Sequence, residues 1–147
     1  MSTSIEKEPA LEKFLSGYNC AQAVLYSACE RLNFDKNMAL RLSSGFGAGM
    51  ARSQEVCGAV TGGIMALGLK YGRGDGEEKS KTEETYKRTR TFMSAFGEKH
   101  GSVLCRELIK CDLSTPEGQQ YFKDNELLRK TCAVCVATAI DLVASEV

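Results

Sequence analysis

Seven cysteines are the residues of this sequence whose side chains could carry out chemistry. They stand at positions 20, 29, 57, 105, 111, 132 and 135. A cysteine thiolate is a nucleophile, a redox group and a soft metal ligand, whereas a buried thiol often serves only as a small apolar side chain. The one histidine, His100, has no partner at the H-x3–5-H spacing of a zinc site. Any metal would therefore have to be held by thiolates.

The number of cysteines and the first residues predict a reducing compartment. Seven is an odd number, and the opening stretch MSTSIEKEPA lacks the apolar segment of a secretory signal. A disulfide framework is a poor explanation for these cysteines, because a reducing cytosol keeps such bridges open. We expect a cytoplasmic location.

The composition is that of an ordinary globular domain. Of the 147 residues, 43% are hydrophobic and 26% are charged. Nineteen basic residues balance nineteen acidic ones, so the chain lacks the electrostatic footprint that nucleic acid requires. No apolar run reaches the roughly 20 residues of a membrane-spanning helix, so no direct membrane insertion is expected. We expect one helical domain over residues 1–147.

The spacing of the apolar residues predicts an all-α fold, a bundle of about five to seven helices. Asn19 and Gln22 have the pattern of a reciprocal capping box, and Thr115 has that of an N-cap. His100, followed by Gly101, is expected to be a favourable cation at a helix C-terminus. The expected helices cover residues 5–14, 19–32, 35–44, 57–71, 77–100, 102–110 and 131–145, and one more starts near residue 116.

Glycine is concentrated in the middle of the chain. Ten of the fourteen glycines lie within residues 45–76. This stretch lacks the G-x-x-x-x-G-K-[ST] motif of a phosphate-binding loop, and no strand precedes it. Within the expected helix 57–71, Gly62, Gly63 and Gly68 each cost about 1 kcal/mol relative to alanine. That cost indicates a buried central helix whose backbone comes very close to its neighbours.

Four of the cysteines are predicted to lie in the first turns of four separate helices. They are Cys20, Cys57, Cys105 and Cys132. Free backbone N–H groups and the positive end of the helix dipole favour an anion at such a position and lower the pKa of a thiol there. If the four helix starts converge, they form a partly positive pocket suited to four thiolates or to an iron–sulfur cluster.

The other three cysteines are interpreted differently. Cys29 and Cys135 suit simple packing, and Cys111 lies near the end of a short helix. Cys132 and Cys135 form a C-x-x-C pair, but the pair lacks the βαβ context of a thioredoxin-like motif. Val136 follows the pair where covalent haem attachment would require histidine.

The motifs resemble those of the C_GCAxxG_C_C family of redox-active proteins. The resemblance rests on the stretches Asn19–Ala23, Cys57–Gly62 and Cys105–Leu108 and on Cys132, and it spans roughly residues 17–140, leaving residues 1–16 as an extension or short helix. The family name writes Gly-Cys-Ala where this chain has Cys-Gly-Ala, and three of the cysteines lie outside the pattern. The family is itself similar to the non-haem part of split-Soret cytochromes, which implies an iron–sulfur centre and a homodimer.

Three functions follow as hypotheses. In the first, Cys20, Cys57, Cys105 and Cys132 bind an iron–sulfur cluster, expected to be [2Fe–2S], and pass electrons to or from an unknown partner. Gly58 and Gly62, with Gly63, would then allow close packing around the cofactor. In the second, the same four cysteines supply the redox thiols of a thiol–disulfide oxidoreductase or redox sensor. In the third, the chain is a non-catalytic helical module or accessory subunit, with zinc held by thiolates as one variant.

Overall fold

The computed structural model describes residue 5 and residues 7–147, and every named element in this part of the chain is helical. The all-α expectation is confirmed. The α-helices are α1 (Lys7–Leu15), α2 (Cys20–Leu32), α3 (Lys36–Ser43), α4 (Gly47–Met50), α5 (Gly58–Tyr71), α6 (Ser80–His100), α7 (Cys105–Ile109), α8 (Pro116–Asp124) and α9 (Ala133–Glu146). A 3-10 turn, η1 (Ser44–Phe46), and a π-helical turn, η2 (Leu128–Cys132), complete the elements.

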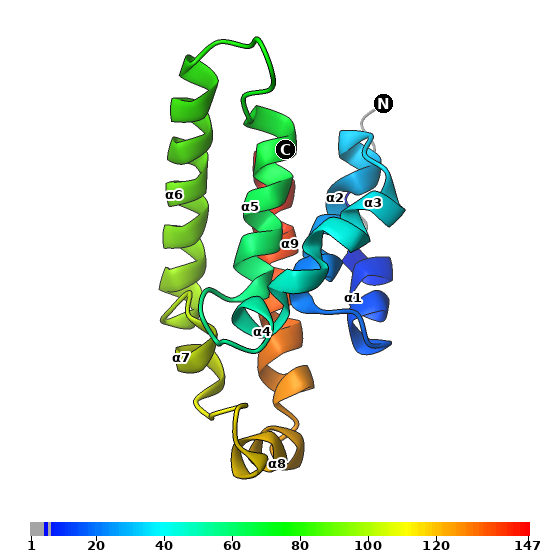
Figure 1. Ribbon diagram of the computed structural model, residues 1–147, viewed down its shortest axis with the longest axis vertical. Coiled ribbons are helices and arrows are strands. Elements are labelled where there is room, and N and C mark those ends of the chain that lie inside the picture. Colours follow the sequence, from blue (N-terminus) through cyan, green and yellow to red (C-terminus); the bar gives the residue numbers. More distant parts are fainter. Residues whose placement is uncertain (1–4, 6) are drawn as a thin grey trace.

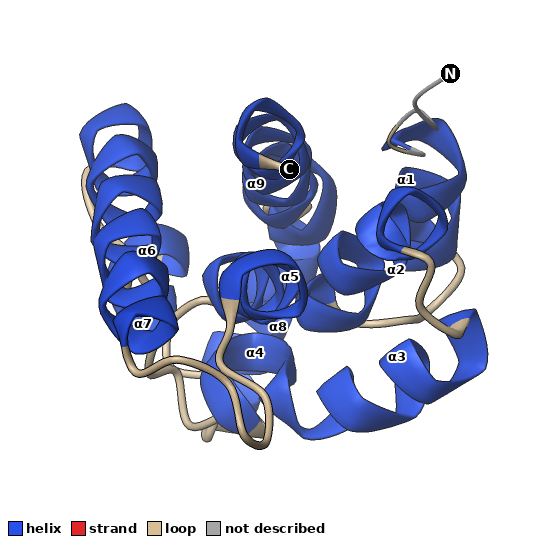
Figure 2. Ribbon diagram, turned by 90° about the horizontal axis from the view of Figure 1, so that it is seen from above, coloured by secondary structure: helices blue, strands red, loops and turns tan. Residues whose placement is uncertain are grey.

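The long helices are arranged around α5. Helix α5 packs against α2, α6 and α9, and Figure 2 shows it lying among these three. Helices α2, α5 and α9 all begin at their lower ends in Figure 1 and run upward, and α7 and α8 lie in the lower half of the molecule. The N-terminal ends of three packed helices therefore point in the same direction, although they are far apart in the sequence.

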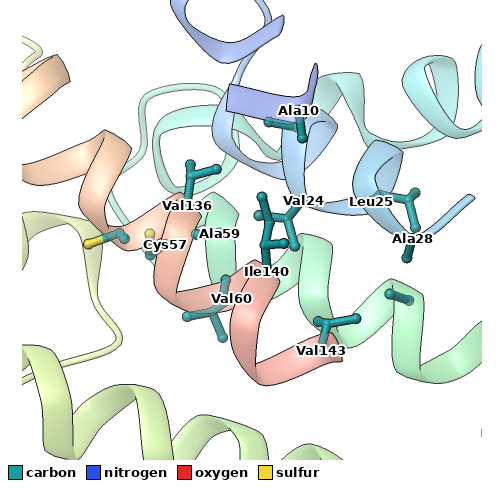
Figure 3. Packing of buried hydrophobic residues seen from close by; sticks show 14 of the residues in the cluster. Ala10, Val24, Leu25, Ala28, Cys57, Ala59, Val60, Val136, Ile140 and Val143 are labelled. Carbon is teal, nitrogen blue, oxygen red and sulfur yellow. The ribbon is translucent and has the colours of Figure 1, made fainter. Parts of the chain in front are cut away.

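The core lies between α2, α5 and α9. Val24 from α2, Val60 from α5 and Ile140 from α9 belong to one cluster of buried residues, part of which Figure 3 shows, and each is at most 1% exposed. Cys57 belongs to the same cluster of buried residues. The residue that precedes α5 is therefore packed within the hydrophobic core. None of the helices in the described part of the chain is both long and apolar enough to cross a membrane.

The two predicted capping signals are confirmed, and a third cap is present that was not predicted. The Asn19 side chain accepts the N–H of Gln22, and the Gln22 side chain accepts the N–H of Asn19, each over 2.9 Å. The Asp35 carboxylate caps α3, and the Thr115 hydroxyl accepts the N–H of Gly118 at the start of α8. Each cap satisfies a backbone donor that the helix itself leaves without a partner.

Some boundaries differ from those expected. Helix α6 begins at Ser80 rather than residue 77, because the Glu77 carboxylate accepts the N–H of Gly74 and belongs to the preceding turn. The first helix begins at Lys7, and the part of that prediction that concerns residue 6 lies outside the described residues. The described part of the chain contains more helical segments than expected, because the connections at residues 44–50 and 128–132 also form short helical turns.

His100 ends α6 and Gly101 follows it in the left-handed conformation, as expected, but the expected role of His100 as a cation does not agree with its surroundings. Its Nε2 lies 2.9 Å from the Thr138 hydroxyl on α9, and its ring packs against Phe96. Burial, and then the nearby Lys99 charge, lower the pKa of His100 from its ordinary value of 6.5. The imidazole is therefore mainly neutral at pH 7 and links α6 to α9, rather than acting as a cation at the helix end.

Residues 48–52 form a left-handed turn, which the sequence did not predict. All five residues have positive φ, from 53° at Ala48 to 70° at Met50. Only Gly49 among them adopts this conformation without a steric cost, whereas other L-residues lose roughly 1–2 kcal/mol each. Backbone hydrogen bonds from Gln54 to Ala48 and from Glu55 to Gly49 hold the turn closed. Strain of this kind is concentrated at functional sites.

Candidate functional site

Cys20 is the first residue of α2, as predicted from its capping box. The box fixes where the helix starts, so it also fixes the position of the half-buried Cys20 thiol. Burial raises the pKa of Cys20 well above its ordinary value, and the nearby Cys57, Cys132 and Cys105 raise it further. The four sulfurs therefore lie close enough to one another for their charges to interact electrostatically.

Cys57 directly precedes α5 in the N-cap position. The neighbouring Cys135 thiol is the largest cause of a lowered pKa at Cys57, and together with the nearby backbone N–H groups of Ala59 and Val60 it outweighs the effect of burial. Cys57 is therefore the cavity cysteine that is most readily deprotonated.

A short antiparallel pairing brings Cys105 to Cys57. Val56 and Leu104 form an isolated β-bridge. On either side of it, the Cys57 N–H donates to the Val103 carbonyl over 2.8 Å, and the Cys105 N–H donates to the Glu55 carbonyl over 2.7 Å. Two cysteines that are 48 residues apart in the sequence are thus held on neighbouring, hydrogen-bonded backbone segments. The sequence analysis did not foresee this bridge.

The predicted position of Cys132 at a helix start is wrong. Cys132 ends the π-helical turn η2, which runs into α9 with helical backbone angles of φ −65° and ψ −44° at this residue. Thr131 therefore does not cap the helix. The helical stretch begins four residues before Cys132, at Leu128, because no glycine or proline interrupts the chain there. Single π-helical turns within helices occur frequently at functional sites.

One cavity brings these thiols together. It has a volume of about 630 Å³, and five cysteines line it: Cys20, Cys57, Cys105, Cys132 and Cys135. They come from the starts of α2, α5 and α7, from η2 and from α9. The four cysteines predicted as site residues are therefore neighbours in space, with Cys135 as a fifth.

The sequence analysis expected the helix starts to lower the pKa of all four thiols. At Cys105 and Cys132 the pKa is raised instead. Burial, and then the nearby Cys57 and Cys111, raise the pKa of Cys105 to about 12, although Arg106 acts in the opposite direction. Burial likewise raises the pKa of Cys132 to about 12, with Cys57 and Cys105 contributing. Desolvation and repulsion between neighbouring thiolates thus exceed the gain from the helix start at these positions.

Cys135 is the site residue that the sequence analysis missed. It is 2% exposed and its thiol donates a hydrogen bond to Cys57, which raises the pKa of Cys135 itself. The C-x-x-C spacing was the available signal, because residues three apart lie on the same face of a helix. The packing interpretation of Cys135 is therefore incomplete.

Cys29 and Cys111 do not line the cavity. Cys29 is buried inside α2, where its thiol donates to the Leu25 carbonyl over 3.3 Å. Cys111 is half-buried, and burial followed by the nearby Asp112 charge raises its pKa. The packing interpretation of Cys29 agrees with this environment.

Gly58 and Gly62 allow α5 to approach α2 at the cavity. A Cβ atom at Gly62 would lie 2.6 Å from the Ala21 carbonyl oxygen, and one at Gly58 would lie 3.1 Å from the Cys20 Cβ. Of the two, only Gly58 lines the cavity. Both glycines therefore act by close backbone packing, which holds the Cys20 and Cys57 ends of the two helices together.

The side chains as they stand do not form a site for a single metal ion. Among the described residues, no group of three or more His, Cys, Asp or Glu side chains is arranged so that it could hold one. A tetrahedral zinc site needs three or four protein ligands on one ion. This geometry gives no support to the zinc variant.

A family model that covers nearly the whole chain matches the sequence. The model is described as "Putative redox-active protein (C_GCAxxG_C_C)" and matches residues 18–146, a span that contains all five cavity cysteines. No curated protein and no solved structure matches the chain. The resemblance noted from the cysteine motifs is confirmed, and the chain belongs to the C_GCAxxG_C_C family of redox-active proteins.

Proposed function

We propose that Cys20, Cys57, Cys105 and Cys132 bind an iron–sulfur cluster, through which the protein transfers electrons. The observation that carries this proposal is the convergence of these four thiols, from four separate elements, on one cavity. A function that uses one reactive cysteine or one pair of thiols would not require four thiols to converge. Four cysteine thiolates are the usual ligands of both [2Fe–2S] and [4Fe–4S] clusters.

The donor set fits a cluster better than it fits one ion. A cluster divides its four thiolate ligands among several irons, so no iron needs three protein ligands. When bound, the cluster would supply one-electron transfer.

The surrounding backbone supports thiolate at this site. The backbone N–H groups of Ala59 and Val60 help to lower the pKa of Cys57, so they offset part of the cost of burying a thiolate. Hydrogen bonds to ligand sulfurs also help to set the reduction potential of a cluster. Gly58 and Gly62 keep α5 against α2, so that Cys20 and Cys57 face the same cavity.

Iron and sulfide analysis tests this proposal. Protein expressed and purified without oxygen should contain about two iron and two sulfide per chain if the cluster is [2Fe–2S]. Its visible absorbance should bleach on reduction, and the reduced protein should give an EPR signal. Serine in place of Cys20, Cys57, Cys105 or Cys132 should each abolish iron binding.

Cys111→Ser is the matched control, because Cys111 is a half-buried thiol near the cavity that does not line it. This variant should retain iron and sulfide at the level of the unchanged protein. Colourless, iron-free protein from iron-supplemented anaerobic cultures would contradict the proposal. Equal loss of iron in the control would contradict the ligand assignment.

The contact between Cys57 and Cys135 favours a second candidate function. The Cys135 thiol already hydrogen-bonds the Cys57 sulfur, whose pKa is lowered. In this alternative, a bond forms between the two sulfurs while a disulfide of a redox partner is cleaved to two thiols. The partner takes up the two electrons and two protons that the cysteine pair loses.

Mass spectrometry separates the two functions. A thiol–disulfide protein loses two hydrogen atoms on oxidation and regains them on reduction, and peptide mapping places the bond between Cys57 and Cys135. Cys135→Ser should abolish this bond. In the iron–sulfur protein, the same variant should still bind iron, because Cys135 is not among the four ligands.

A further inference from the structure

The cavity beside the cysteines has the size and lining of a small-molecule site. Its volume of about 630 Å³ lies within the range of roughly 300–1,000 Å³ that is typical of pockets for small organic ligands. Apart from the cysteines, much of the lining is apolar or aromatic and includes Phe14, Tyr18, Leu108, Phe122 and Leu128. Such a lining favours a ligand with an apolar body.

The side chains of ordinarily charged residues that line the cavity are all positive in the described part of the chain. Arg52 and Lys123 line the cavity, and no Asp, Glu or His side chain is among the described residues that do so. Both side chains belong to exposed residues and therefore lie at the mouth, whereas Cys57, Cys105 and Cys135 are buried. In the described part of the chain, neither cation takes part in an ion pair.

Arg52 is placed at the mouth by the left-handed turn. It is the last of five consecutive residues with positive φ, and the first of them, Ala48, also lines the cavity. The nearby Glu55 carboxylate does not neutralise Arg52, because it pairs with Arg106 over 2.7 Å. A conformation that costs stability thus holds, beside an apolar cavity, a cation that forms no ion pair with any described residue.

We propose that this cavity binds a small organic anion, with its apolar body against Phe14, Phe122 and Leu128 and its acidic group between Arg52 and Lys123. The cavity walls carry the cysteine cluster, so the bound molecule lies next to the redox site. This binding site goes beyond the proposed function, and because a cluster on the same cysteines would share the cavity, the binding test uses iron-free protein. Its test is therefore independent of iron analysis.

Two fluorescent probes that differ by one charged group test the proposal. 8-Anilinonaphthalene-1-sulfonate is an aromatic anion, and N-phenyl-1-naphthylamine is the same ring system without the sulfonate. Purified full-length, iron-free protein, kept free of oxygen, is titrated with each probe. The anionic probe should bind with one-to-one stoichiometry and more tightly than the neutral probe, and added salt should weaken its binding.

Arg52→Gln and Lys123→Gln separate charge recognition from general apolar binding. Each should weaken binding of the anionic probe about threefold, as expected for the loss of one solvent-screened charge contact. Binding of the neutral probe should stay unchanged in both variants. The two residues lie on different segments, so one variant remains informative if the other unfolds, which thermal unfolding would show.

Lys87→Gln is the matched control, because Lys87 is an exposed cation on α6 and does not line the cavity. It should bind both probes as the unchanged protein does. The proposal is overturned if the neutral probe binds as tightly as the anion. It is also overturned if both cavity variants keep full affinity for the anion, or if Lys87→Gln weakens it equally.

Discussion

At the scale of single residues, the contacts of each sulfur decide which cysteine is reactive. The Cys135 thiol lowers the pKa of Cys57, and the backbone N–H groups of Ala59 and Val60 contribute to the same effect. Cys105 and Cys132 line the same cavity, yet burial raises the pKa of both to about 12. A shared pocket therefore holds thiols of very different acidity.

In metal-free, reduced protein, Cys57 should be the first cavity thiol to react with iodoacetamide as the pH rises. Replacing Cys135 with alanine removes the largest cause of the lowered pKa, so the pKa of Cys57 should rise. Alkylation at pH 7 should then slow, and the midpoint of the rate–pH profile should move to higher pH. Cys111→Ser should leave the profile unchanged. An unaltered midpoint in Cys135→Ala would show that Cys135 does not activate Cys57.

His100 predicts a loss of stability in mildly acidic solution. Its pKa in the folded protein lies below the ordinary value of 6.5, so the unfolded chain binds a proton more readily. The free energy of unfolding should be constant above about pH 6.5 and should fall as the pH decreases below that value. Urea unfolding at pH 7.5 and pH 5.5 measures the change. His100→Gln should remove it, and an equal loss in this variant would assign the effect to other groups.

At the scale of elements, the contact between α5 and α2 is a backbone contact. Gly62 faces the Ala21 carbonyl, whereas Gly68, two turns later in the same helix, has nothing within 4 Å of where its Cβ would be. The two glycines have the same intrinsic helix propensity, so the difference between them isolates the packing effect.

Gly62→Ala should lower the free energy of unfolding by about 1–3 kcal/mol, because its Cβ would lie 2.6 Å from a backbone oxygen. Gly68→Ala is the control and should raise it by about 0.5–1 kcal/mol, the gain from alanine in an open helical position. Chemical denaturation measures both variants. Effects of the same sign would mean that α5 and α2 do not meet at Gly62.

Glycine is expected to stabilise the folded protein when it replaces an alanine in the left-handed turn. Ala51 is exposed with φ 53° and ψ 45°, and glycine adopts this conformation without the steric cost of Cβ. Ala51→Gly should therefore raise the free energy of unfolding by about 1 kcal/mol. Ala95→Gly, within the right-handed helix α6, should lower it by about 0.5–1 kcal/mol. Destabilisation by Ala51→Gly would exclude a left-handed backbone at this position.

At the scale of the whole molecule, the cysteine cavity joins segments that are distant in sequence. Helices α2, α5 and α9 all begin at their lower ends, and α7 is attached near the start of α5 through the Val56–Leu104 bridge (Figure 1). A ligand held by thiols from all of these segments stabilises the folded chain but not the unfolded one.

If the proposed cluster binds, removing its iron with a chelator should lower the midpoint of thermal unfolding by about 5 °C or more. Calorimetry under nitrogen measures the midpoints before and after chelation. Cys105→Ser, which should bind no iron, provides the control, and the chelator should leave its midpoint unchanged. Equal midpoints for iron-loaded and iron-free wild-type protein would show that the bound metal does not connect these helices.

Helix starts were predictable from the sequence because a cap and its partner are close in the chain. Asn19 and Gln22 are three residues apart, as are Thr115 and Gly118, so each contact depends on local backbone geometry. Cys20 could be placed at the start of a helix for this reason. The cysteine motifs also identified the family, because motif spacing is a property of the sequence alone.

Tertiary structure decided the remaining features of the site. The start of the helical stretch before Cys132, the bridge beside Cys57 and the left-handed turn at residues 48–52 depend on segments that meet only after folding. The acidity of each thiol likewise depends on how far water is excluded and on which donors and other sulfurs lie nearby. Most helices and their caps could be predicted from the sequence, because they depend on short-range interactions. The pairing of Cys57 with Cys135 required the packing of α5 against α9, which no local pattern encodes.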